Sequence, residues 1–243
     1  MMFELSGLRR ETRYGMPAAD QILFNRFFVT GYSYYFRQAK WALEIIDSNA
    51  KDVNIVERID NFRPDMRIPM MFRTALSDYR HSGYDRGHLV ASANHQDEQL
   101  QNSETFLLSN MSPQKPGFNQ KIWRELEHAI RELDARDNIL ETFVICGPIF
   151  DFNLPVQAIG VEDDDNEVSI PIPHAFFKSI LTENDRGRFD VYSFIIPNKE
   201  TDKDVSTFLK PTIEVEYKAG IFLWDKLSGT RIDKEKYAKG AMW

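Results

Sequence analysis

Short apolar runs, separated by glycine, proline or asparagine, recur along the chain and predict a strand-rich fold. Runs of this length and composition are typical of strands buried within a sheet. We expect strands at residues 27–36, 105–109, 142–149, 175–182 and 189–196, and a second strand or a short helix at 40–47. The sequence Thr-Glu-Asn-Asp-Arg-Gly-Arg at 182–188 predicts a hairpin turn between the last two strands.

One segment, residues 120–136, has the spacing of an amphipathic helix. Its apolar residues form one stripe: Ile122, Trp123, Leu126, Ala129, Ile130 and Leu133. At about 100° per residue, Asn119 projects near the middle of this stripe and Glu127 lies at its edge. Because Asn119, Trp123 and Glu127 are four residues apart, the two polar groups can face a shared site. The plainer alternatives are an N-cap for Asn119 and an ion pair between Glu127 and Arg131.

The composition is that of a packed globular protein, with 42% hydrophobic and 28% charged residues in a chain of 243. The sequence shows no repeat, linker or low-complexity tract, so we predict one domain over residues 1–243. No apolar run approaches the roughly 18 residues of a membrane span, and the first residues lack the features of a signal or transit peptide. Cys146 is the only cysteine, which excludes an intramolecular disulfide. We expect a cytoplasmic protein without membrane attachment.

Charge is distributed unevenly along the chain. The net charge of −7 argues, taken alone, against a nucleic-acid partner. However, residues 1–124 carry 16 basic and 14 acidic residues, whereas residues 125–243 carry 14 basic and 23 acidic residues. The first half also contains a segment with arginines and no lysine: Arg58, Arg63, Arg67, Arg73, Arg80 and Arg86. Arginine makes forked contacts to phosphate, although a solvated surface is the plainer interpretation.

An acidic run, Glu-Asp-Asp-Asp-Asn-Glu at 162–167, predicts an exposed loop. Its carboxylates could also hold a metal ion, but the spacing of an EF-hand loop is missing. We therefore favour a solvated loop over a metal site in this segment.

A cluster of polar and small residues, Asp85-Arg86-Gly87-His88, follows Tyr84 and precedes an apolar stretch. Such a cluster is either a surface turn or a functional strand. If the segment is extended, Arg86 and His88 point to the same side and Asp85 points to the other. Gly87 then leaves room for a backbone or a substrate to approach closely. An unperturbed imidazole titrates near ~6.5, so neutral His88 is available as a base at cytoplasmic pH.

This tetrapeptide and the later helix with Asn119, Trp123 and Glu127 resemble the signature of a known family. The family is the DNA/RNA non-specific endonucleases with a ββα-metal active site, which include secreted bacterial nucleases and mitochondrial endonuclease G. The stretch at 105–119 is also similar to the family's sequence, and it contains Asn110. The resemblance covers nearly the whole chain, and the combination of tetrapeptide and helix at this spacing is specific.

The resemblance implies an α+β fold. A ββα-metal finger at about residues 79–136 would lie within a mainly antiparallel sheet flanked by helices. The tetrapeptide would form one strand of the finger, and the helix at 120–136 would bring the metal ligand to it. One departure is the continuation Leu89-Val90-Ala91-Ser92, where many members have a Leu-Ala-Pro type of sequence. This difference concerns the loop after the strand rather than the catalytic residues.

For catalysis, the resemblance implies that His88 is the general base that activates water. Arg86 and Arg58 would grip or neutralise the phosphate. Arg63 is the alternative to Arg58, because both lie in the same segment. Asn110 would orient His88 or its backbone.

For the cofactor, the resemblance implies Mg²⁺, with Mn²⁺ able to substitute. Asn119 would be the direct ligand through its amide oxygen, and Glu127 would hold metal-bound water molecules. The hydrated ion would stabilise the charge that develops on phosphate and on the leaving 3′ oxygen. Asp85 is interpreted as structural, pairing with a neighbour and fixing the strand.

Together these roles imply a metal-dependent, sequence-nonspecific endonuclease. It would hydrolyse DNA and/or RNA to 5′-phosphate and 3′-hydroxyl ends. The sequence shows no base-reading motif, so contacts should go mainly to phosphate and binding should weaken strongly with salt. The alternatives are a catalytically silent module that binds nucleic acid or protein, and a phosphodiesterase or phosphatase that acts on a small molecule.

A nuclease kept inside a cell endangers that cell. We therefore expect an inhibitor or an activating partner protein, with the acidic C-terminal half as its contact surface. The family resemblance adds a homodimer to these expectations.

Overall fold

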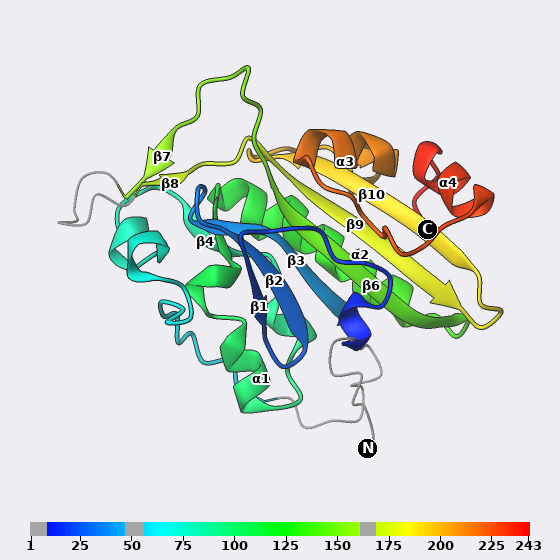
Figure 1. Cartoon of the computed structure of the whole chain (residues 1–243), viewed down its shortest axis with the longest axis horizontal. Coiled ribbons are helices and arrows are strands. Elements are labelled where there is room, and N and C mark those ends of the chain that lie inside the picture. Colours follow the sequence, from blue (N-terminus) through cyan, green and yellow to red (C-terminus); the bar gives the residue numbers. More distant parts are fainter. Residues whose placement is uncertain (1–8, 47–55, 161–168) are drawn as a thin grey trace.

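The main sheet of the protein is antiparallel and runs through the length of the molecule (Figure 1). The computed structural model describes residues 9–46, 56–160 and 169–243. Within these residues, seven strands form the sheet in the order β1-β2-β3-β6-β9-β10-β11. Their bounds are Gln21–Phe24 (β1), Phe28–Ser33 (β2), Gln38–Ile46 (β3), Ile139–Ile149 (β6), Ala175–Asn184 (β9), Phe189–Pro197 (β10) and Leu209–Lys210 (β11). The sheet is antiparallel at every neighbouring pair.

Burial of both faces explains why the long strands have continuous apolar sequences. On β9, Phe176 and Ile180 belong to the core cluster on one face of the sheet, whereas Phe177 and Leu181 belong to the cluster on the other. A strand that is covered on both sides needs apolar residues at successive positions rather than at alternate ones.

Helices cover both faces of this sheet. Helix α2 (Arg124–Asp134) packs on one face through Leu126 and Ile130. Helices α3 (Thr212–Ala219) and α4 (Thr230–Tyr237) pack on the other face and lie over β10 (Figure 1). A short helix, α1 (Gln99–Glu104), and a two-stranded sheet of β7 (Ala158–Ile159) and β8 (Ile170–Pro171) lie beside the main sheet.

A further two-stranded sheet leads into α2 and completes a ββα unit. Strand β4 (Asp85–His88) pairs antiparallel with β5 (Met111–Gln114), so that His88 lies opposite Met111. After β5 the chain enters a π-helical turn, η7 (Phe118–Trp123), which continues directly as α2. The α+β fold is the one predicted, and this ββα unit falls within the segment 79–136.

Most of the predicted elements are confirmed, and the differences have local causes. The strands at 142–149, 175–182 and 189–196 are present; the one predicted at 27–36 covers only 28–33 and is followed by a turn. Residues 40–46 lie in strand β3, and residue 47 is outside the described residues. The hairpin turn is also present, with Gly187 at φ 64°. The predicted helix begins earlier, in η7, and ends at Asp134. The acidic run 162–167 lies outside the described residues.

The predicted strand at 105–109 is wrong. Its residues form a turn followed by a 3-10 helix, Leu108–Asn110. The backbone of this buried segment is bonded outside a strand ladder: the Leu108 N–H donates to the Arg63 carbonyl, the Phe106 carbonyl accepts from the Arg63 N–H, and the Thr105 carbonyl accepts from Asn110 Nδ2. These hydrogen bonds replace the ladder that a buried strand would need.

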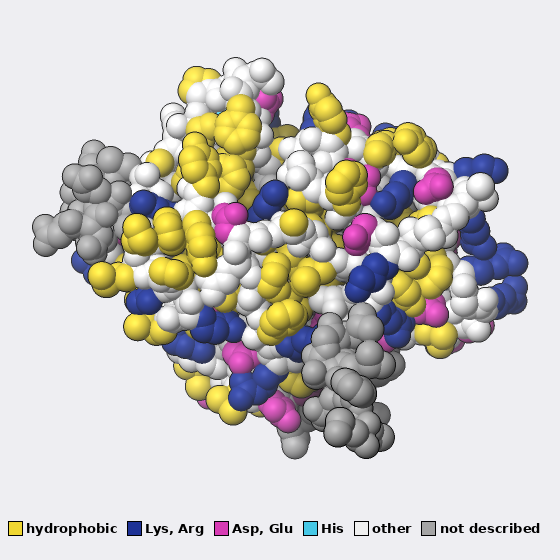
Figure 2. Space-filling model, viewed as in Figure 1, with side chains coloured by type: hydrophobic (Ala, Val, Ile, Leu, Met, Phe, Trp, Pro, Cys, Tyr) yellow, Lys and Arg dark blue, Asp and Glu magenta, His cyan; other side chains and the backbone are white. Residues whose placement is uncertain are grey.

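The surface carries an apolar groove near the β2–β3 turn. It is lined by Tyr34, Tyr35, Phe36, Phe72, Phe152 and Val156. Figure 2 shows hydrophobic side chains gathered on the part of this face near β7 and β8. The exposed fractions of Tyr35 and Phe152 are 79% and 70%. Among the described residues, no helix is long and apolar enough to span a membrane.

Candidate active site

Strand β4 holds two candidate catalytic side chains against a pair of phenylalanines. The His88 ring meets the Phe62 ring edge-on, at 5.6 Å between centroids, and the Phe106 ring at 5.1 Å. The Arg86 guanidinium lies 4.2 Å from the centre of the Phe62 ring. The Arg58 guanidinium lies 5.2 Å from the centre of the Phe106 ring. Arg86 and His88 therefore point to the same side, as alternation along a strand predicts.

Burial changes the acid–base character of His88. Its Nε2 atom is buried and has no hydrogen-bond partner among the described residues. The pKa of the imidazole is lowered to about 3, chiefly by burial and then by the Arg58 and Arg86 charges, while Asp60 opposes the shift. The expectation of an ordinary pKa near ~6.5 is therefore wrong for the free protein. The neutral form that a base needs is still the one present, and a bound phosphate would offset the two arginine charges.

A pocket of about 590 Å³ opens beside β4 and the π-helical turn. Its wall includes Arg58, Phe62, Tyr79, Tyr84, Asp85, Arg86, Asn119 and Gln120. His88 contacts this wall through Phe62. The fold thus brings two candidate phosphate-binding arginines and the candidate metal ligand around one space, next to the candidate base.

Asp85 fixes the side-chain amide of Asn119. Asn119 Nδ2 donates to Asp85 Oδ2 over 2.9 Å, and Gln120 Nε2 donates to the same oxygen over 2.9 Å. No described residue donates to Asn119 Oδ1, so this oxygen remains available as a ligand. Asp85 and Arg86, predicted to point to opposite sides of the strand, both line the pocket. Asp85 is the first residue of a short strand, and the two amide donors hold its carboxylate toward the helix.

Asn119 lies inside the π-helical turn rather than at a helix N-cap. The turn begins after Gly117, and the Asn119 backbone N–H donates to the Lys115 carbonyl over 2.9 Å. A π-turn shifts residues out of the α-helical register and is frequent at functional sites. Here the turn contains Asn119, whose side chain bonds to Asp85. Asn119 is therefore not a helix N-cap, which was the plainer alternative.

Gly87 and Asn110 fix how β4 packs against its neighbours. A side chain at Gly87 would overlap Gln114 on the facing strand, so the close neighbour that glycine admits is Gln114. Asn110 is fully buried; its Oδ1 accepts from the Val90 N–H over 3.0 Å. Its Nδ2 donates to the Val90 and Thr105 carbonyls, each over 2.9 Å. Asn110 therefore fixes the segment directly after β4.

Glu127 lies on the sheet side of α2 and pairs with a residue outside the motif. Its Oε1 is 3.4 Å from Nζ of Lys178 on β9, and its side chain is 13% exposed. Arg131, the partner in the plainer alternative for Glu127, instead donates to Asn94 Oδ1 over 3.0 Å. Burial raises the pKa of Glu127, and the Lys178 charge opposes that rise. In the described part of the chain, no hydrogen bond or ion pair joins Glu127 to Asn119.

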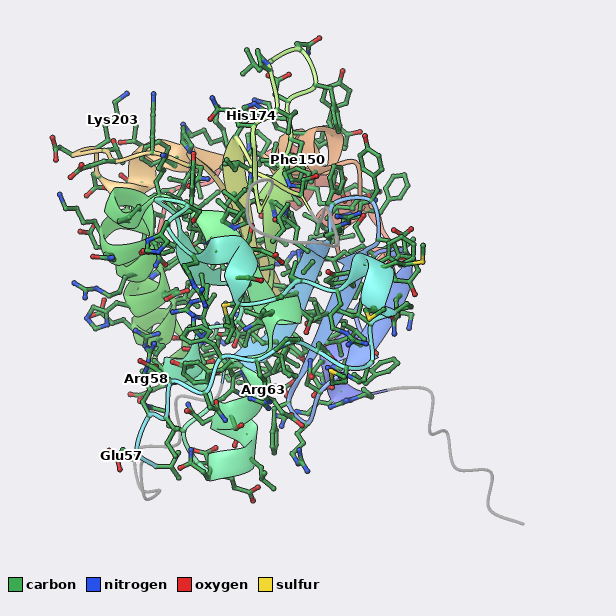
Figure 3. All side chains as sticks on the ribbon, turned by 90° about the vertical axis from the view of Figure 1, so that its left-hand side faces the viewer. Glu57, Arg58, Arg63, Phe150, His174 and Lys203 are labelled. Carbon is green, nitrogen blue, oxygen red and sulfur yellow. The ribbon has the colours of Figure 1, made fainter. Side chains whose placement is uncertain are left out.

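Arg58 and Arg63 differ in their position relative to the pocket. Both lie on one extended segment (Figure 3). Arg58 is part of the pocket wall and donates to Ser92 Oγ over 3.3 Å. Arg63 Nη1 donates to the Ser103 carbonyl over 2.9 Å, and its backbone bridges Leu107. Arg63 thus ties the segment to its neighbours, whereas Arg58 faces the pocket.

The pocket fits a cation that takes oxygen ligands and keeps several waters. Asp85, Asn119 and Gln120 bring carboxylate and amide oxygens to its wall. The described residues contain no group of three or more His, Cys, Asp or Glu side chains that could enclose a metal ion. Mg²⁺ bound by one or two protein oxygens, water and phosphate suits this donor set.

Sequence reasoning missed three contributors to the site: Phe62, Phe106 and Lys178. The phenylalanines carry no signal, because aromatic residues are frequent throughout the chain. Lys178 does carry one. It stands alone in the apolar run 175–182, where a charged residue is out of place in a buried strand.

Comparison with known proteins places the chain in a class. The model of the DNA/RNA non-specific endonuclease family matches residues 7–230. The chain belongs to this family and is a hydrolase of the endonuclease type.

Individual relatives agree with this assignment. The chain is 35% identical to mitochondrial endonuclease G of Caenorhabditis elegans, over 95% of this chain and 77% of that protein. It is 32% identical to mitochondrial endonuclease G of Homo sapiens, over 86% of this chain and 71% of that protein. Among solved structures, an EndoG/EndoGI complex, described in terms of EndoG inhibition, matches with a TM-score of 0.81. That match has 30% identity and covers 90% of this chain and 91% of the other.

Proposed function

We propose that this chain hydrolyses phosphodiester bonds in DNA and/or RNA, without sequence preference and with a divalent metal ion. One observation carries the proposal. Arg58, Arg86 and Asn119 surround a single pocket, and the His88 ring, whose Nε2 is unpaired among the described residues, packs against Phe62 of the pocket wall. An anion, a cation and a water molecule can meet in such a place.

The steps of the chain's own residues follow from their chemistry. Arg58 and Arg86 hold the non-bridging oxygens of the phosphate. His88 Nε2 takes a proton from a water molecule as the water oxygen attacks phosphorus. The bond from phosphorus to the 3′ oxygen then breaks, and that oxygen takes a proton from solvent. The products carry 5′-phosphate and 3′-hydroxyl ends.

Asn119 and Glu127 would hold the metal ion, Asn119 through Oδ1 and Glu127 through water. Asp85 presents the Asn119 oxygen by holding its amide nitrogen. When bound, Mg²⁺ or Mn²⁺ supplies positive charge for the developing charge on phosphate and the leaving oxygen. Asn110 keeps the backbone after His88 in place.

The test compares wild type with His88→Ala on supercoiled plasmid, each with Mg²⁺ and with EDTA. Wild type should nick the plasmid only with metal, and the variant should lose ~10²–10⁴-fold of the rate. Equal nicking by His88→Ala would show that another group is the base. RNA and a small phosphodiester serve as parallel substrates, and hydrolysis of the small molecule alone would favour the phosphodiesterase alternative.

Partners and location are part of the same proposal. We propose that a protein inhibitor binds this chain, because the structural match described above is an EndoG/EndoGI complex whose description concerns EndoG inhibition. A homodimer stays a prediction, which sedimentation equilibrium of the purified chain measures. A cytoplasmic location also stays a prediction, since the curated relatives above are named mitochondrial. Cell fractionation tests it.

A further inference from the structure

Lys178 lies where a lysine is costly. Its neighbours on the same face of β9 are Phe176 and Ile180, which pack in the core between the sheet and α2. The residue is 1% exposed. A buried ammonium is tolerated only when partners compensate for the water it has lost. The question is therefore which groups compensate here.

Both partners of the Lys178 ammonium come from the segment that carries the candidate metal ligand. The ammonium lies 4.2 Å from the centre of the Trp123 ring and 3.4 Å from Glu127 Oε1. Trp123 ends the π-helical turn that contains Asn119, and its Nε1 donates to the His88 carbonyl over 3.3 Å. One side chain of the sheet thus contacts two of the three motif positions on this helix.

The other charged groups near Glu127 are engaged elsewhere. Arg131 donates to Asn94 Oδ1. Glu44, 1% exposed, accepts from Asn94 and lies 3.0 Å from His95 Nε2. Among the described residues, Lys178 is the one cation paired with Glu127. Without it, the mostly buried Glu127 carboxylate would lose its ion-pair partner, and only the more distant charge of Arg131 would still stabilise it.

We propose that Lys178 is a positioning residue of the active site, which fixes the Glu127 carboxylate so that it can hold the water shell of the metal ion. This inference rests on the proposed function. Lys178 touches neither substrate nor metal; it acts through Glu127, and the Trp123 ring helps to hold the ammonium in place.

The test replaces Lys178 with methionine, which has nearly the same length and suits the apolar surroundings. Mn²⁺ binding to the full chain is measured by EPR titration, beside the Mg²⁺ concentration for half-maximal cleavage. Loss of a group that orients a metal-bound shell typically weakens metal binding about 10- to 100-fold, and this is the expected result. KM for DNA at saturating Mg²⁺ should stay within about 3-fold, because the arginines that hold phosphate are untouched.

Lys218→Met is the matched control. Lys218 on α3 also lies 3.4 Å from a glutamate oxygen, that of Glu214, but the pair is exposed and on the other face of the sheet. This variant should leave Mn²⁺ binding unchanged. An equal loss in both lysine variants would overturn the proposal, as would unchanged Mn²⁺ binding in Lys178→Met.

A double-mutant cycle separates positioning from general damage to the core. If Lys178 acts through Glu127, Lys178→Met should change Mn²⁺ binding less than about 2-fold in a Glu127→Gln background. Additive losses would refute the mechanism. If the single variant does not fold, Lys178→Gln, which keeps a donor, takes its place in the cycle. A wild type that neither binds Mn²⁺ nor cleaves DNA would refute the proposed function itself, whereas a competent wild type with an unchanged variant refutes only this inference.

Discussion

Lys178 and Ser179 are adjacent on β9 and point to opposite faces of the main sheet. Lys178 sends an ammonium toward α2, where Glu127 and Trp123 receive it. Ser179 sends a hydroxyl to the α3 face, where it bonds to Ser193 Oγ of β10 over 2.8 Å. Both are buried, but only one is charged. A buried charge weakens a core unless something else requires it, so the charge marks the face that carries the chemistry.

The two faces differ in this way beyond β9. The α2 face also holds Glu44, with His95 and Asn94 around it. On the α3 face, the buried polar groups that β9 and β10 contribute are the hydroxyls of Ser179 and Ser193, which bond to each other and to Thr212. The buried carboxylate on that side, Glu216, belongs to helix α3 and pairs with Lys236 on α4. The comparison teaches that one face can be read as scaffold and the other as support for a site. The predictions below test that division.

The largest expected effect on stability belongs to the scaffold face. Phe177 is fully buried there. Phe177→Ala should lower the free energy of unfolding by about 3–5 kcal/mol, through lost burial and a cavity. Cleavage per folded molecule should be unchanged. Urea denaturation gives the first quantity, and the cleavage rate at a temperature where the variant is fully folded gives the second. A folded variant with impaired cleavage would break the comparison.

The largest effect on chemistry without loss of stability should come from Arg58. Arg58→Gln removes a charge from the pocket and should slow cleavage ~10²–10³-fold, the range found for loss of one charge-stabilising donor. Arg63→Gln should cost about 1 kcal/mol of stability, from its lost bond to the Ser103 carbonyl, and leave cleavage nearly intact. Steady-state rates and thermal unfolding of both variants decide the matter. A reversed order would make Arg63 the phosphate-binding residue.

Much of this site could be predicted from spacing, and the remainder could not for physical reasons. Asn119 and His88 follow from a tetrapeptide and a helix of recognisable pattern. The lowered pKa of His88 depends on burial that Phe62 and Phe106 help to provide, from segments that come together only in the fold. The partner of Glu127 lies 51 positions away in the sequence, on a central strand. Spacing along the helix suggests Arg131 as the ion-pair partner of Glu127, because a sequence reveals pairs within one helix but not pairs between distant segments.

A similar limit applies to the fold. The long strands were predictable because burial on both faces leaves continuous apolar sequence. Strand β5, Met-Ser-Pro-Gln, has no apolar run, and it forms because β4 offers it a partner. The apolar segment at 105–109 shows the reverse case, in which burial occurs without a strand because the Asn110 side chain and the Arg63 backbone bond to the backbone there.

The pH dependence of stability should separate His88 from the scaffold. Its folded-state pKa of about 3 lies below the ordinary value near ~6.5, so the unfolded chain binds a proton that the native state does not. The free energy of unfolding should therefore fall as pH drops below about 6.5, by up to about 1.4 kcal/mol per pH unit from this residue. In His88→Asn that contribution should be missing. Urea denaturation of both proteins at pH 7.5, 6.0 and 5.0 measures the His88 contribution. It is the difference between the two free energies of unfolding at each pH, because the contributions of the other titrating groups are the same in both proteins. Parallel pH profiles would mean that His88 is accessible to protons in the native state.

The smallest expected effect is that of Ser179→Ala, the neighbour of Lys178 on the scaffold face. Ser179 Oγ accepts from Trp224 Nε1 over 3.0 Å, and it also bonds to Ser193 Oγ. Losing this neutral group should cost about 1 kcal/mol of stability, or somewhat more because the indole N–H is left without its acceptor. Mn²⁺ binding and cleavage should not change, since no charge leaves the α2 face. The informative measurement is the pair of neighbours together. Lys178→Met should weaken Mn²⁺ binding, whereas Ser179→Ala should lower only the free energy of unfolding. If Ser179→Ala also weakened Mn²⁺ binding, the sheet would be transmitting disturbance from either face, and the charge of Lys178 would no longer explain the effect of its removal.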